Sequence, residues 1–285
     1  MWKTLKPCAA ALSCLLLPAV AAAQTATCND FGHFDVFVDV DANSTDSERL
    51  RILRDNPFDP NASFPLDFES RSLLVPADFG DFGGGPHKTD DPGWVIETGN
   101  LAANELLWFR ALGTLDFWNT ATGQWQSAPP AGERLRFFGA IPPEVFLNGD
   151  PDELAFYQQG TIWSANGLEG PTESAIEQAS GDGTIHSHLD FCIEDSTGDC
   201  SAPGIGQTGS PAVGAYLIEL ELFSDAVDAN GDPKYADSAP VKVVLNNGLV
   251  AEECAAAIEA LTQPAADQGA ERETPASGIL ILNGE

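Results

Sequence analysis

The sequence predicts an all-β fold: a single sandwich or jelly-roll-like domain with a short C-terminal helix. Many short segments alternate apolar and polar residues with a period of two, and these segments are rich in β-branched and aromatic side chains. Clusters of glycine, proline, asparagine and aspartate separate them, as turns between strands require. Such punctuation is typical of sandwiches and barrels. Neither a fixed repeat nor a linker divides the chain, so one domain is expected.

The strands predicted from this alternation cover residues 33–40, 106–112, 114–118, 134–140, 184–194, 215–223 and 241–246. Helix is sparse. The clearest helical spacing runs over residues 249–261, which are rich in alanine and are followed by Pro264. Weaker helical patterns cover 171–180 and 46–54.

Residues 1–23 have the features of a cleaved secretory signal peptide. Lys3 and Lys6 precede an apolar run over 9–17, and the segment ends in three alanines at Ala23. The apolar run is too short to span a bilayer. We therefore expect a mature β domain over 24–264, a tail over 265–285, and a periplasmic or extracellular location.

The chain is strongly acidic, with 13 lysines and arginines against 43 aspartates and glutamates and a net charge of −30. Loss of the two signal-peptide lysines would leave 11 basic residues, or 11 minus 43, a charge of −32. Such a surface repels nucleic acid and anionic membranes and attracts cations. It is equally compatible with a protein that only needs to stay soluble in salt water.

Four cysteines remain after the signal peptide: Cys28, Cys192, Cys200 and Cys254. An even number in an oxidising compartment favours two disulfides, for which three pairings are possible. Residues 194–199 contain a Thr-Gly pair that suits a hairpin turn, which favours Cys192–Cys200 and leaves Cys28–Cys254. The absence of a Cys-x-x-Cys motif argues against a thiolate zinc site.

Two of the four histidines, His186 and His188, alternate along the predicted strand 184–194. Alternate side chains of a strand share a face and lie about 6.6–7 Å apart, which lets two imidazoles converge on one ion. Asp190 is expected on the same face. Neutral imidazole with carboxylate suits zinc first, with copper or another transition metal as alternatives.

The other two histidines are expected to help complete this site. His33 shares a predicted strand face with Asp35 and Asp39, and His87 lies in the polar loop 85–92. We therefore expect His33, His87 and Asp190 to be the completing ligands of His186 and His188. The alternative is that these histidines are ordinary surface residues.

Several motifs in the last third of the chain resemble those of small exported bacterial proteins known mainly from cyanobacteria and controlled by a zinc repressor. The motifs are His186-Ser187-His188-Leu189-Asp190-Phe191 and the segments 214–222, 237–240 and 244–249, with a looser echo around His33 and 85–93. The resemblance implies an all-β fold and a role in zinc handling, with the histidines as ligands. Residues 276–285 depart from the family pattern because they contain no Pro-Glu-Pro sorting motif.

Calcium is a weaker alternative. Residues 228–232 and 39–43 resemble half of an oxygen-rich calcium loop, but the glutamate expected at the twelfth position is replaced by Ala239 and Leu50. Ordinary acidic turns are therefore the favoured interpretation.

The function that the sequence favours is an exported transition-metal (zinc) binding protein for metal capture, storage or delivery. Its partners would be the metal ion and a metal transporter or another exported protein. A secreted carbohydrate-binding or surface-structural module is one alternative, and a metallohydrolase is another. No catalytic residue is predicted, because the chain contains neither a Gly-x-Ser-x-Gly elbow nor a His-Glu-x-x-His motif. The carbohydrate alternative depends on exposed tryptophans, for which the candidates are Trp94, Trp108, Trp118, Trp125 and Trp163.

Overall fold

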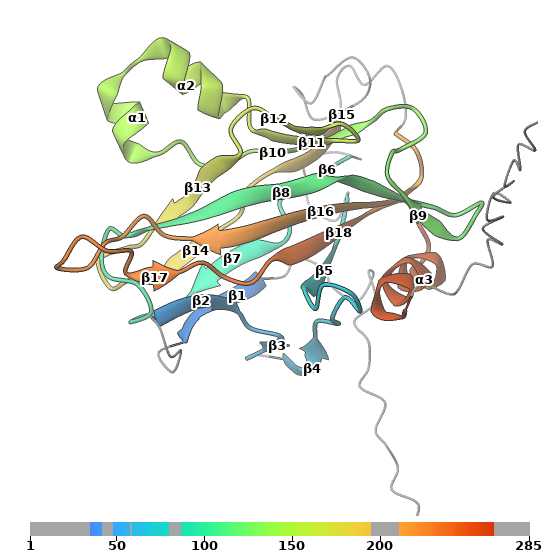
Figure 1. Cartoon of the computed structure of the whole chain (residues 1–285), viewed down its shortest axis with the longest axis horizontal. Coiled ribbons are helices and arrows are strands. Elements are labelled where there is room, and N and C mark those ends of the chain that lie inside the picture. The colour runs from blue at the N-terminus through green and yellow to red at the C-terminus, as the bar shows by residue number, and fades with distance from the viewer. Residues whose placement is uncertain (1–34, 42–47, 58, 80–86, 195–210, 265–285) are drawn as a thin grey trace, which may run out of the picture.

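The computed structural model describes residues 35–41, 48–57, 59–79, 87–194 and 211–264 (Figure 1). The predicted signal peptide, Cys28, His33, Cys200 and the tail over 265–285 lie outside these residues. The described residues form an all-β, sandwich-like structure with one helix near the C-terminus and two short helices elsewhere, which confirms the predicted fold class.

Three large sheets and one small hairpin contain the strands of the described residues. Sheet I has, in spatial order, β14 (Ile185–Ser187), β7 (Gly93–Ile96), β1 (Asp35–Asp41), β2 (Glu48–Ile52) and β17 (Tyr235–Ala236). Sheet II has β12 (Gly167–Glu169), β11 (Thr161–Ser164), β10 (Arg134–Phe137), β15 (Phe191–Glu194) and β6 (Lys88–Thr89). Sheet III has β13 (Glu173–Gln178), β8 (Leu106–Asn119), β16 (Gly214–Phe223), β18 (Val241–Asn247) and β5 (Leu73–Asp78), with β9 (Gln124–Gln126) paired to β8. The hairpin consists of β3 (Asp55–Asn56) and β4 (Asp59–Ser63).

One hydrophobic core joins the inner faces of all three sheets. In β1, Val36 and Val38 are buried in this core while Asp35 and Asp39 lie on the outer face, as the period-two alternation predicts. Removing apolar side chains such as these from water is the main driving force for the sandwich.

Helix α3 (Ala251–Thr262) confirms the predicted C-terminal helix. It covers the outer face of sheet III, where Cys254, Ala257 and Ile258 pack in a second apolar cluster with residues of β16 and β18. The indole of Trp125 donates a hydrogen bond to the backbone oxygen of Ala257 at 2.9 Å, which ties β9 to the helix.

Both weaker helix predictions are wrong. Residues 173–178 form β13, in which a bulge between Ala175 and Glu177 disturbs the alternation that would have identified a strand. Residues 48–52 form β2, paired antiparallel with β1. Two short helices that the alternation did not predict, α1 (Pro143–Asn148) and α2 (Pro151–Gln158), project from the sheets (Figure 1).

The predicted strand 184–194 is also wrong as a single strand, because the chain changes sheets within it. Strand β14 pairs with β7 in sheet I, whereas β15 pairs with β6 in sheet II. The neighbouring segment from β6 to β7 makes the same change. Residues 90–92 and 188–190 thus cross together between the two sheets, and we call this place the sheet crossing.

Cys192 and Cys254 are buried. Their predicted partners, Cys200 and Cys28, lie outside the described residues, so the two pairings stay predictions. None of the helices in the described ranges has the length and apolar character needed to cross a bilayer.

Candidate metal centre

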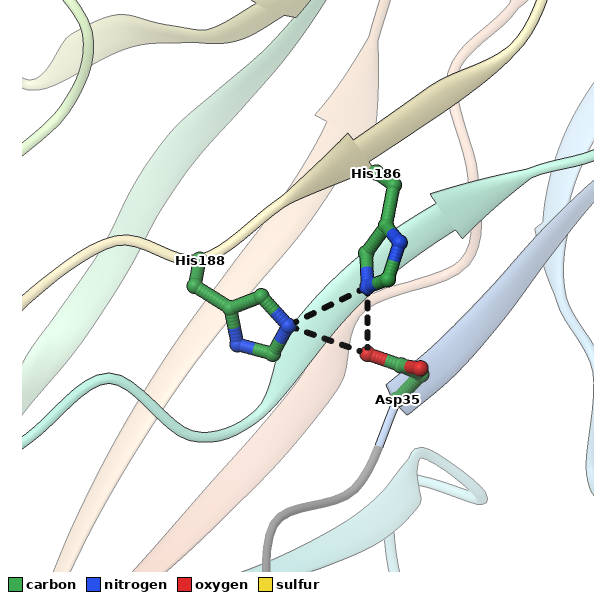
Figure 2. Close-up of side chains that lie close together, drawn as sticks. All are labelled: Asp35, His186 and His188. Carbon is green, nitrogen blue, oxygen red and sulfur yellow. Dashed lines mark hydrogen bonds and ion pairs between the residues drawn. The ribbon is translucent and has the colours of Figure 1, made fainter. Parts of the chain in front are cut away.

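Three potential ligand atoms converge beside the sheet crossing (Figure 2). Asp35 starts β1, His186 is the central residue of β14, and His188 follows that strand. The two Nε2 atoms lie 3.3 Å apart. Oδ1 of Asp35 lies 3.4 Å from Nε2 of His186 and 3.2 Å from Nε2 of His188.

Strand pairing brings these distant residues together. Strand β7 lies between β1 and β14, and Gly93 on β7 is the register partner of Asp35. On its other side β7 pairs antiparallel with β14, with His186 opposite Val95. Continuing this register by two residues places His188 beside Gly93.

Gly93 forms the floor of the centre. A Cβ atom at this position would lie 2.3 Å from Oδ1 of Asp35 and 2.3 Å from Cε1 of His188. Any side chain here would occupy the space in which the ligand atoms meet. The glycine is therefore a requirement of the site.

A hydrogen bond fixes the orientation of the His188 ring. Nδ1 of His188 lies 3.1 Å from the backbone oxygen of Asp90, on the opposite segment of the sheet crossing. Because a carbonyl oxygen only accepts, Nδ1 carries the hydrogen, and in the neutral ring Nε2 presents its lone pair to Asp35 and His186. The buried carboxylate of Asp91, 4.0 Å from Nδ1, adds negative charge on the same side.

The other histidine is held through its backbone. The N–H of His186 donates to the carboxylate of Glu177 on β13, and burial of this carboxyl raises the pKa of Glu177 in spite of the hydrogen bond. Strand β14 is the edge strand of sheet I. The contact with β13 therefore stabilises an edge strand of three residues that carries a candidate ligand.

The electrostatics of the centre favour a cation. Oδ1 of Asp35 is shielded from solvent and accepts no hydrogen bond within the described part of the chain. A carboxylate oxygen and an imidazole lone pair repel each other at 3.2 Å unless a proton or a cation lies between them. A single metal ion would satisfy all three ligand atoms at once.

The size of the centre matches a tetrahedral transition metal. Two ligands about 2.0–2.1 Å from a tetrahedral zinc ion lie about 3.3–3.4 Å from each other. The three observed separations are 3.2, 3.3 and 3.4 Å. The side chain of His186 is 62% exposed, and the described residues supply three ligand atoms, so a fourth position on such an ion would be left to solvent or to a ligand outside these residues.

Two of the three remaining predicted ligands contact other side chains instead. Asp190 lies beyond the end of β14 and pairs with Lys88, at 2.5 Å between Oδ2 and Nζ. Nδ1 of His87 lies 2.9 Å from Oδ1 of Asn247 on β18. His33 lies outside the described residues, and its role as a ligand stays a prediction.

The candidate calcium loops have structural explanations. The carboxylate of Asp228 accepts the backbone N–H groups of Asn230 and Asp232 at 2.8 and 3.0 Å, as in an ordinary acidic turn. Asp39 pairs with Arg51 at 2.7 Å. Both carboxylates are therefore already engaged within the fold.

The tryptophans do not form the exposed platform on which the carbohydrate alternative depends. Four of the five candidates are buried, namely Trp94, Trp108, Trp118 and Trp163. Trp125 is half-buried against α3. No exposed stacking surface can be built from these side chains.

Comparisons of the chain with protein-family models, with curated proteins and with solved structures find no match. The functional argument therefore depends on the geometry of the centre alone.

Proposed function

We propose that the protein is an exported transition-metal binding protein, with zinc as the favoured ion and Asp35, His186 and His188 as its ligands. The observation that carries this proposal is the set of ligand separations, which match the edges of a tetrahedron around zinc. Two imidazoles disfavour calcium and magnesium, which prefer oxygen ligands, and leave copper as the alternative.

Capture and delivery suit this centre better than a permanent structural role. Structural zinc sites are closed by four protein ligands, whereas the described centre supplies three and opens to solvent. An ion with an open position exchanges through incoming ligands. The acidic surface, with a net charge of −30, would raise the local concentration of cations. We propose a metal transporter or another exported protein as the partner.

Replacing Asp35 by alanine is expected to weaken zinc binding by roughly tenfold or more, because a first ligand is lost where even loss of a supporting residue costs about 10–100-fold. The measurement is calorimetry on chelator-treated protein. Asp39→Ala is the matched control, since Asp39 lies on the same face of β1 but pairs with Arg51. Equal affinity of the Asp35 variant and the wild type would contradict the proposed centre.

Zinc affinity is also expected to fall in mild acid. A protonated imidazole nitrogen cannot bind metal, so protons compete with zinc for imidazole ligands in mild acid. With two imidazoles, we expect a roughly ten- to hundredfold loss between about pH 7.5 and about pH 5.5. Calorimetry at the two pH values measures it. Unchanged affinity would show that the ion is held by carboxylates alone.

The described residues supply three ligands, and a fourth position left open by them supports a second candidate function, metal-assisted hydrolysis. A catalytic zinc ion keeps this position for a water molecule whose pKa falls to about 7. Turnover of ester, phosphoester and peptide substrates by the zinc-loaded protein, above that of free zinc, would support hydrolysis. Turnover that persists in the Asp35→Ala variant would assign it to something other than this centre.

A further inference from the structure

A pocket of about 490 Å³ adjoins the proposed metal centre along β7 and β14. His186 belongs to both, because it is a ligand of the centre and also lines the pocket. The other lining residues are Val95, Ile96, Glu97, Thr98, Thr184 and Ile185. A ligand that takes the open metal position therefore has a recess for the rest of its body.

The chemistry of the pocket selects among such ligands. Its wall beside His186 is Val95, the cross-strand partner of that histidine. At the end remote from Gly93 lie the hydroxyls of Thr98 and Thr184 and the exposed carboxylate of Glu97. Glu97 is negatively charged, and the whole chain has a net charge of −30. The pocket therefore disfavours anions and favours a cationic group at this end.

The dimensions correspond to a short extended peptide. Glu97 is four residues beyond Gly93 on β7, which is about 13 Å along a strand. In an extended peptide, residues at positions i and i+2 point to the same side about 6.6–7 Å apart. A long basic side chain at i+2 covers the remaining distance to Glu97 when a donor at position i lies at the metal.

We propose that this pocket binds an extended, basic segment of a partner protein, in which a histidine takes the fourth position on the metal and a lysine or arginine two residues later pairs with Glu97. This inference rests on the proposed metal centre and specifies its partner. The incoming imidazole displaces a bound water molecule, so the ion is shared between two proteins by ligand exchange and without redox chemistry. The lining residues on β7 and β14 would then determine which segments are accepted.

The test uses the full chain loaded with cobalt(II), whose visible absorption reports a change of ligands. The probes are three tripeptides blocked at both ends: His-Ala-Lys, His-Ala-Ala and Ala-Ala-Lys. We expect both histidine peptides to change the spectrum and Ala-Ala-Lys to leave it unchanged. His-Ala-Lys should bind about two- to fivefold more tightly than His-Ala-Ala, as an exposed ion pair provides.

Glu97→Gln is expected to abolish the difference between the two histidine peptides without changing cobalt affinity. Glu48→Gln, which removes an exposed carboxylate elsewhere on sheet I, is the matched control and should preserve the difference. If cobalt binds but neither histidine peptide changes the spectrum, or if the wild type binds the two equally, this inference is overturned and the metal centre stands. If cobalt itself does not bind, the proposed function fails as well.

Discussion

Replacing both His186 and His188 by alanine is expected to abolish stoichiometric zinc binding. The two imidazoles supply two of the three ligand atoms that meet within 3.4 Å, and the single carboxylate of Asp35 that remains would be left without a second ligand. We expect an affinity loss of roughly a hundredfold or more, down to the weak binding of scattered carboxylates. Calorimetry on chelator-treated protein measures it.

A second variant separates the geometry of the centre from the identity of its ligands. Gly93→Ala keeps all three ligands but places a methyl group 2.3 Å from Oδ1 of Asp35 and from Cε1 of His188. It should lower zinc affinity nearly as far as the double histidine variant. Thermal unfolding of each apo variant verifies the fold, and the single variant His186→Ala, at an exposed position, is the least disruptive control. Tight binding by the double variant would place the ion elsewhere.

Replacing Glu194 by glutamine is expected to lower the free energy of unfolding by about 3 kcal/mol. Its side chain is fully buried and pairs with Arg134 at 2.6 Å and with Arg136 on the adjacent strand β10. Removing one member of a buried ion pair leaves its partners uncompensated and typically costs about 3–5 kcal/mol. The low end applies because both arginines are partly exposed. Urea unfolding without reductant measures the change.

The control for this variant uses the same arginine. Arg134 also pairs with Glu169 at 3.0 Å, but the side chain of Glu169 is 52% exposed. Glu169→Gln should cost less than about 1 kcal/mol, as exposed ion pairs do. Equal effects of the two substitutions would mean that burial of Glu194 adds nothing to the stability of sheet II.

The fold class follows from local patterns, because alternation and turn residues are properties of neighbouring positions. The same patterns did not give the correct strand bounds wherever a strand was interrupted. Gly113, with a φ of 68°, separated two predicted strands that belong to the single strand β8. A bulge concealed β13, and the sheet crossing divided 184–194 between two sheets. Each interruption is set by contacts with strands remote in sequence, which local periodicity does not contain.

Prediction of the candidate site from the sequence has the same limit. Alternation was enough to pair His186 with His188, since those residues are two positions apart. It placed Asp35 on a polar face but did not select it as a ligand, because only the strand order β14–β7–β1 brings it to the histidines. Gly93 was not singled out from the sequence, although a glycine within a strand often marks a place where other groups approach the backbone closely.

The wide separation of the candidate ligands along the chain bears on when the proposed centre could take up an ion. Asp35 and His186 are 186 minus 35, or 151, positions apart, and they meet only after β1, β7 and β14 have joined. A nascent chain offers no more than a lone His-x-His pair. If the chain is secreted in an unfolded state, as the predicted signal peptide implies, it would cross the membrane without a bound metal ion. It would then bind its first ion in the compartment in which it folds.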